Sequence, residues 1–292
     1  MDSAGNMTVD ANTLPIESSR RWWWPYTHPL VVRICIVLLI LKVILGVSAG
    51  AAVASRGVLH GWTHILNSRS LSYTFGTSEL TEGEGSLFWN IAVNGYTDYD
   101  QKNIAKFPLY SAVTRSLWNV TGQTVSVTLI LSILHSLMVW AGVAETYRFW
   151  EEYRAGYGRR AVLWLLLSPL FVLHIWLASY MEPGFIALMW LSLTLEYKRK
   201  WALCSAALLC LTMLQPSGVI LACFLGVRRL YQWSKGKTPL TAVVWALLPG
   251  AAWLIWIVFT SLWFHRFLAA YAFQDQWGRG TFRWALGAVD CF

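Results

Sequence analysis

Charged residues are scarce in this sequence. Only 13% of its 292 residues are Asp, Glu, Lys or Arg, whereas 56% are hydrophobic and the mean hydropathy is +0.46. Soluble domains carry about 25% charged residues, so this composition argues against an ordinary soluble protein. It indicates instead an all-α, multispanning integral membrane protein.

Cysteine is also sparse, and the five cysteines show no spacing typical of metal ligands. The first four, Cys35, Cys204, Cys210 and Cys223, lie within apolar runs, where we interpret them as small buried side chains. The histidines likewise form no cluster of ligands. We therefore expect no metal site and no cofactor.

Acidic residues are outnumbered, with 15 Asp and Glu against 23 Lys and Arg, which gives a net charge of +8. In a soluble protein such an excess would suggest a nucleic-acid partner. Here the cations fall mainly in short loops between hydrophobic segments, and no compact basic face with interleaved aromatics is present. We therefore exclude nucleic acid as a partner.

About seven hydrophobic segments follow a polar N-terminal tail at residues 1–29. No clean cleavage site follows the first segment, which we interpret as a signal anchor. The segments are predicted at 30–54, 124–147, 161–177, 185–197, 201–214, 217–231 and 240–264. Residues 30–292 are expected to form one membrane domain with a large outer loop at 55–123.

The short loops differ in charge. Three of them carry four, three and four cations, at residues 148–160, 197–200 and 228–237. The opposite loops, 179–184 and 215–218, carry none. The positive-inside rule places the cationic loops and the N-terminus in the cytoplasm, and residues 55–123 and the segment from 265 outside.

Several segments are shorter than a bilayer. A helix at 201–214 would span about 21 Å, less than the hydrocarbon core of about 30 Å. The pair 201–214 and 217–231 is therefore predicted to turn at QPSG below the outer surface and to leave a recess there. The alternative is a pair of tilted helices with interfacial extensions.

Residues 86–111, SLFWNIAVNGYTDYDQKNIAKFPLYS, are too polar to span a bilayer and too aromatic for a plain linker. They contain I-A-x-x-G-Y at 91–96 and F-P-L-Y-S-x-x-x-R at 107–115. Both patterns resemble the region after the first span in the GPI mannosyltransferase 2 (PIG-V-like) family, with Ser111 where Pro is usual. We expect an amphipathic helix at the membrane interface, followed by a turn at F-P-L-Y.

Two further blocks resemble the same family in the same order. They are SPLFVLHIWLASYMEPGFIAL at 168–188 and AFQDQWGRG at 272–280. The resemblance covers roughly residues 80–280 and implies a glycosyltransferase of the GT-C type. Such an enzyme would transfer a hexose, most often mannose, from a polyprenyl-phosphate donor to a lipid-linked or membrane acceptor outside the cytoplasm.

The chain departs from the family pattern at two places. Gly83 and Glu84 stand where the family has W-D, so the carboxylate is kept but lies one methylene further out. The chain ends at Phe292, where relatives continue through several more spans. We expect a short or truncated form with an incomplete C-terminal part.

The transfer reaction needs a base for the acceptor hydroxyl and donors that hold the leaving phosphate. Glu84 is the first candidate base and Glu182 the second. Arg115 and Arg279 are candidates for bidentate phosphate binding, and Lys106 adds a point charge.

Aromatic and amide side chains complete the expected substrate site. Phe88, Trp89, Tyr96 and Tyr110 are candidates to line sugar or lipid surfaces. The W-G-R block adds Gln274 and Trp277 as substrate-binding candidates.

Simpler interpretations stay open for the charged candidates. Glu84 can be part of a solvated acidic loop, Glu182 can solubilise a tight turn, and Arg279 can anchor to lipid headgroups. The alternative function is a non-catalytic membrane partner on the same scaffold. A solute transporter is a distant third, because no internal repeat is present.

The expected partners are the polyprenyl-phosphate donor, the membrane acceptor, membrane lipids and a membrane partner subunit. The expected location is the plasma membrane in a prokaryote or the endoplasmic reticulum membrane in a eukaryote.

Overall fold

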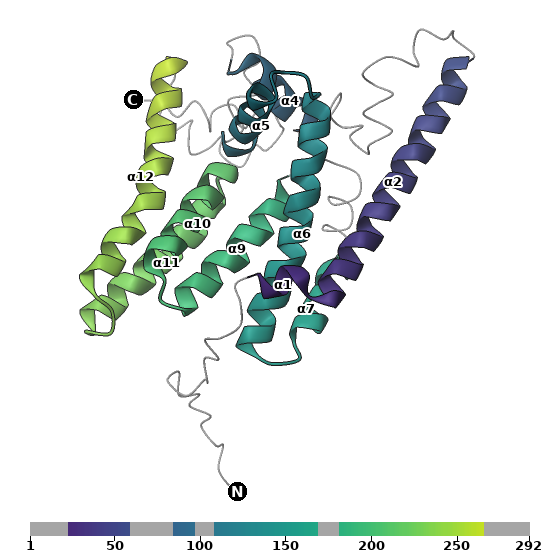
Figure 1. The fold of residues 1–292 in the computed structure, drawn as a ribbon. Helices are drawn as coiled ribbons and strands as arrows, with labels where there is room; N and C mark the ends of the chain where they lie inside the picture. Colours follow the sequence, from purple (N-terminus) through teal and green to yellow (C-terminus); the bar gives the residue numbers. More distant parts are fainter. Residues whose placement is uncertain (1–22, 59–83, 97–107, 169–180, 266–292) are drawn as a thin grey trace, which may run out of the picture.

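The computed structural model of the protein describes residues 23–58, 84–96, 108–168 and 181–265, and its regular elements within these ranges are all helices. Figure 1 shows their arrangement. The helices are α1 (Trp24–Thr27), α2 (Pro29–Val58), α4 (Glu84–Asn94), α5 (Leu109–Val120), α6 (Val127–Tyr153), α7 (Gly158–Leu167), α9 (Glu182–Tyr197), α10 (Trp201–Leu214), α11 (Gly218–Ser234) and α12 (Leu240–Trp263).

The longer helices lie side by side and alternate in direction along the chain (Figure 1). The helices α4 and α5 lie at one end of this bundle, which we call the α5 end. The connections α6–α7, α9–α10 and α11–α12 lie at the opposite end, together with α1. We call this the cationic end, because the Lys and Arg residues of the predicted cytoplasmic loops lie in these connections or in the helix turns next to them.

Helices occupy the positions predicted for the hydrophobic segments. The prediction at 201–214 matches α10, and α2, α9, α11 and α12 begin and end within a few residues of their predicted bounds. The predicted turn at QPSG is confirmed, since α10 ends at Leu214 and α11 begins at Gly218. The second half of the predicted segment 161–177 lies outside the described residues.

One boundary was predicted wrongly. The segment predicted at 124–147 is a longer helix, α6, which continues through residues 148–153 of the predicted loop. Its start is fixed by Ser126, whose hydroxyl accepts a hydrogen bond from the Leu129 amide at 3.2 Å. Its last turns pack against α9, because Phe149 and Trp150 contact the Trp190 ring and Glu152 pairs with Lys198 at the end of α9.

Two of the described helices, α6 and α12, are long and apolar enough to cross a membrane. Their 27 and 24 residues correspond to lengths of about 40 and 36 Å at 1.5 Å per residue. Helix α10 has 14 residues and stops short of the level that α12 reaches at the α5 end (Figure 1).

Small residues bring α6 and α9 close together. A β-carbon built on Gly142 of α6 would lie 3.0 Å from the carbonyl oxygen of Pro183 in α9. A β-carbon on Gly184 of α9 would lie 3.1 Å from Leu214 and even closer to Met138. Glycine at these positions allows the two backbones to approach more closely than larger side chains would permit. This crossing places the start of α9 beside the upper half of α6, near α4 and α5.

Candidate functional site at the α5 end

The helices α4 and α5 are joined by a buried aromatic pair. Phe88 and Tyr110 meet edge to face with ring centroids 5.1 Å apart. The Tyr110 hydroxyl donates to the carbonyl of Leu131 in α6 at 3.1 Å, and the Ser111 hydroxyl donates to the carbonyl of Phe88 at 3.4 Å. These contacts fix both helices against α6. The structure thus places Phe88 and Tyr110, two predicted substrate-lining residues, in the core.

The predicted amphipathic helix in this region is present as α4. Its buried residues are Leu87, Phe88, Ile91 and Ala92, which share one face at helical spacing. Trp89 projects from another face and is 39% exposed. Of the aromatic residues predicted to meet a substrate, Trp89 is therefore the one that α4 leaves accessible.

The end of α4 brings together two residues that the family pattern singles out. Gly95 follows the helix with a φ of +76°, a conformation that favours glycine. A β-carbon at Gly95 would lie only 3.3 Å from Nη1 of Arg115, so the guanidinium lies over the Gly95 backbone. A cation is favourable at this place because the last carbonyls of α4 carry partial negative charge.

Tyr96 links the same turn to α12. Its ring lies 5.2 Å from that of Trp256, and both belong to a small apolar cluster with Met213 and Trp253. Burial raises the pKa of Tyr96 well above its usual range, so its hydroxyl stays protonated at neutral pH. Tyr96 therefore connects α4 to the part of α12 that lies at the α5 end.

Both candidate carboxylates are the first residues of helices. Glu84 begins α4, one turn before Phe88, and Glu182 begins α9. Glu182 is half-buried, with one carboxylate oxygen shielded from solvent, and follows Met181 in the same apolar cluster as Phe88 and Tyr110. A helix N-terminus favours negative charge, which suits the carboxylate of Glu182.

The structure thus gathers part of the predicted site at one end of the bundle. The segments of Trp89, Tyr96, Arg115 and Glu182 meet there, around the cluster that Phe88 and Tyr110 form. The other predicted residues, Lys106, Gln274, Trp277 and Arg279, lie outside the described residues.

Sequence reasoning missed a buried ion pair at the cationic end. Arg229 of α11 is fully buried, and its Nε donates to Oε2 of Glu196 in α9 at 2.9 Å. Its Nη1 donates to the hydroxyl of Ser205 in α10 at 3.0 Å and to the carbonyl of Ala242 in α12 at 3.3 Å. The guanidinium also lies over the ring of Trp201. One side chain therefore contacts α9, α10 and α12.

A second buried pair lies on α6. Arg148 pairs with Glu145 one turn before it, and the Tyr26 hydroxyl donates to the same carboxylate. Burial, followed by the neighbouring Glu145 carboxylate, raises the pKa of Tyr26. This contact ties α1 to α6 at the cationic end.

The two buried arginines correct one interpretation of the sequence. Arg148 and Arg229 were counted among the loop cations, but they lie inside α6 and α11 and are neutralised by glutamates. The acid three residues before Arg148 was the available signal for the first pair, whereas Glu196 and Arg229 are too far apart in sequence to suggest the second. The charge difference between the two sets of loops persists, since the other cations of these loops are unaffected.

No known family model, curated protein or solved structure matches this chain.

We predict that Gly95→Ala destabilises the protein by about 1–2 kcal/mol, because the β-carbon of alanine is sterically strained in the left-handed backbone conformation. The added β-carbon also pushes against Arg115, so the cost should be smaller in an Arg115→Ala background. The measurement is thermal unfolding in detergent micelles. Gly122→Ala is the matched control, because Gly122 has a φ of +59° and a β-carbon there would meet nothing within 4 Å. Equal costs of Gly95→Ala in both backgrounds would contradict the contact.

We predict that Arg229→Met lowers the free energy of unfolding by about 3–5 kcal/mol, because it leaves Glu196 buried and unpaired. The double variant Arg229→Met/Glu196→Leu should recover most of this loss, because it removes the orphaned charge as well. Lys237→Met, which removes an exposed cation at the same end, should change stability by no more than about 0.5 kcal/mol. A double variant as unstable as the single one would show that the pair does not act as described.

Proposed function

We propose that the protein is a multispanning membrane glycosyltransferase. It uses the α5 end to transfer a hexose, for which we propose mannose, from a polyprenyl-phosphate donor to a membrane acceptor. The observation that supports this most is the packing of α4 and α5 across the ends of α6 and α10, beside the start of α9. This packing gathers two carboxylate positions, an arginine and exposed aromatic surface at the end opposite the cationic loops.

Exposed apolar side chains support a multispanning arrangement beyond α6 and α12. On α11, Ile220, Phe224 and Val227 are all more than 60% exposed and follow one another at helical spacing. A continuous apolar face of this kind is costly in water and favourable in lipid. Helix α2 carries a similar set, Ile36, Val37, Leu39, Ile40, Val43 and Ile44.

The charge distribution supports an orientation. The connections at the cationic end, together with the first turn of α7, contain Arg154, Arg159, Lys198, Arg199, Lys200, Lys235 and Lys237. The positive-inside rule then places this end in the cytoplasm and the α5 end on the other side of the membrane. A donor whose sugar is displayed on that side would meet α4 and α5 first.

The proposed chemistry is a single displacement. The oxygen of the acceptor hydroxyl attacks the anomeric carbon, the bond from that carbon to the phosphate oxygen breaks, and polyprenyl phosphate leaves. A carboxylate at Glu84 or Glu182 accepts the hydroxyl proton. Arg115 stabilises the negative charge that grows on the phosphate, since its planar guanidinium suits two phosphate oxygens.

The test is a transfer assay in membranes that contain the protein, with labelled polyprenyl-phosphate mannose and native membrane acceptors. Glu84→Gln should reduce transfer by about 10²–10⁴-fold, because the amide cannot accept the proton. Glu84→Asp, which restores the carboxylate usual in the family pattern, should retain activity or raise it. Glu151→Gln, a half-buried glutamate at the cationic end, is the matched control and should transfer normally.

Two results would count against the proposal. If Glu84→Gln and Glu182→Gln both match an active wild type, neither carboxylate is the base. If the wild type transfers nothing with its natural membranes, the non-catalytic alternative holds.

A further inference from the structure

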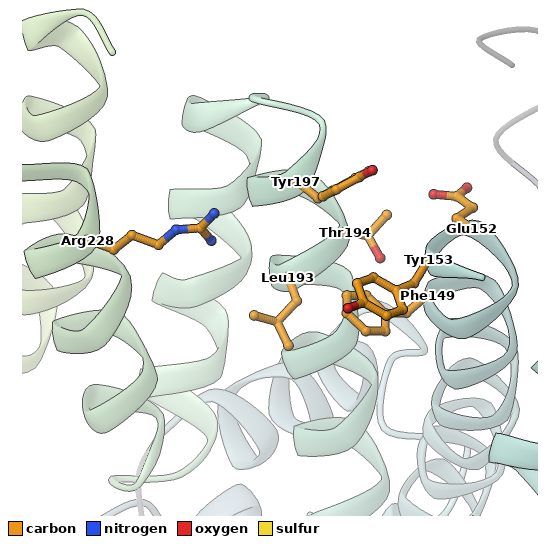
Figure 2. Close-up of a pocket in the computed structure, with 7 residues that line it drawn as sticks. All are labelled: Phe149, Glu152, Tyr153, Leu193, Thr194, Tyr197 and Arg228. Atoms are coloured by element: carbon orange, nitrogen blue, oxygen red, sulfur yellow. The ribbon is translucent and has the colours of Figure 1, made fainter. Parts of the chain in front are cut away.

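A groove of about 280 Å³ lies at the cationic end, between α6, α9 and α11. Figure 2 shows the residues that line it. Phe149 and Tyr153 extend into it from α6, and Leu193 of α9 forms the apolar wall between α6 and α11. The groove is thus chiefly apolar and aromatic, and it lies far from the α4–α5 pair along the bundle (Figure 1).

The two charged side chains that line the groove, Glu152 and Arg228, differ in whether they are paired. Glu152 is neutralised, because its Oε1 accepts a hydrogen bond from Nζ of Lys198 at 2.8 Å. Arg228 projects from α11 toward α9 (Figure 2), and no carboxylate among the described residues lies within ion-pair distance of it. Its neighbour Arg229 differs in both respects, being buried and paired with Glu196. The groove therefore carries one exposed guanidinium without an acidic partner.

The surface changes from apolar to polar at the level of this groove. Phe224 and Val227 of α11 are exposed within about one turn of Arg228, on its side toward the middle of the helix. Tyr153, Tyr197 and Tyr231 are also exposed, and they lie in the last turns of α6, α9 and α11, on the polar side of the groove. Aromatic residues gather at the boundary between lipid tails and headgroups, so the groove opens at headgroup depth if the bundle lies in a membrane.

We propose that this groove binds an anionic phospholipid of the cytoplasmic leaflet, with its phosphate on Arg228 and one acyl chain against Leu193 and Phe149. Basic pockets between membrane helices on this side select anionic headgroups, and the guanidinium matches a phosphate in charge and in geometry. A zwitterionic lipid fits less well, because the acidic side chain that lines the groove, Glu152, is already paired with Lys198. The inference rests on the membrane location proposed above and is independent of transferase activity.

The test is native mass spectrometry of the purified protein, released from micelles that contain phosphatidylglycerol or phosphatidylcholine. The wild type should retain phosphatidylglycerol in preference to phosphatidylcholine. Arg228→Gln should lower phosphatidylglycerol retention about fivefold, the effect of one cation near an anionic surface, and Arg228→Lys should keep most of it. Lys237→Gln removes the same charge outside the groove and should leave retention unchanged.

A second variant tests the apolar part of the groove. Leu193→Trp should fill it and lower retention even with Arg228 in place, and its unfolding temperature shows whether the fold is kept. Equal retention of both lipids by the wild type would overturn the proposal. An equal loss in Lys237→Gln and Arg228→Gln would also overturn it, because general surface charge would then account for binding.

Discussion

The buried pair of Glu196 and Arg229 is the constraint on which the cationic end depends. A guanidinium removed from water needs partners for its charge and for its N–H groups, and each partner here lies on a different helix. Sliding α11 by one residue against α9, α10 or α12 would leave at least one of these groups unpaired. The pair therefore sets the register of four helices, in a region where apolar packing alone would allow slippage.

The register of these helices also determines which residues lie at the α5 end. Because α9 is fixed by Glu196 at its last turn and by the close crossing of Gly142 at its start, its first residue, Glu182, is held beside the cluster of Phe88 and Tyr110. Helix α12 is fixed by Ala242 near its start and meets Tyr96 through Trp256 further along. Glu182 of the proposed site thus lies at a helix end whose position is determined about 20 Å or more away, over the length of α9.

Much of the helix pattern could be predicted from the sequence, because long apolar runs interrupted by cationic or Pro-Gly turns leave few other solutions. The amphipathic character of α4 was also predictable from its alternation of aromatic and polar residues. The burial of individual side chains could not be predicted. Tyr110 and Arg229 lie in segments whose sequence indicates a surface position, but in the structure they bond to Leu131 and Glu196, which are distant in sequence. For the same reason the sequence suggested Arg115 as a phosphate ligand but not its contact with Gly95.

On the proposed topology, the α5 end and the cationic end face opposite sides of a membrane, and labelling of single cysteines at each end distinguishes the two sides. Ser116 on α5 and Ser234 at the end of α11 are both exposed, so each can be replaced by cysteine in a variant that lacks the five native cysteines. In sealed right-side-out vesicles, a membrane-impermeant maleimide should label Ser116→Cys, and it should label Ser234→Cys only after the membrane is permeabilised. Labelling of both positions from the same side would contradict the account.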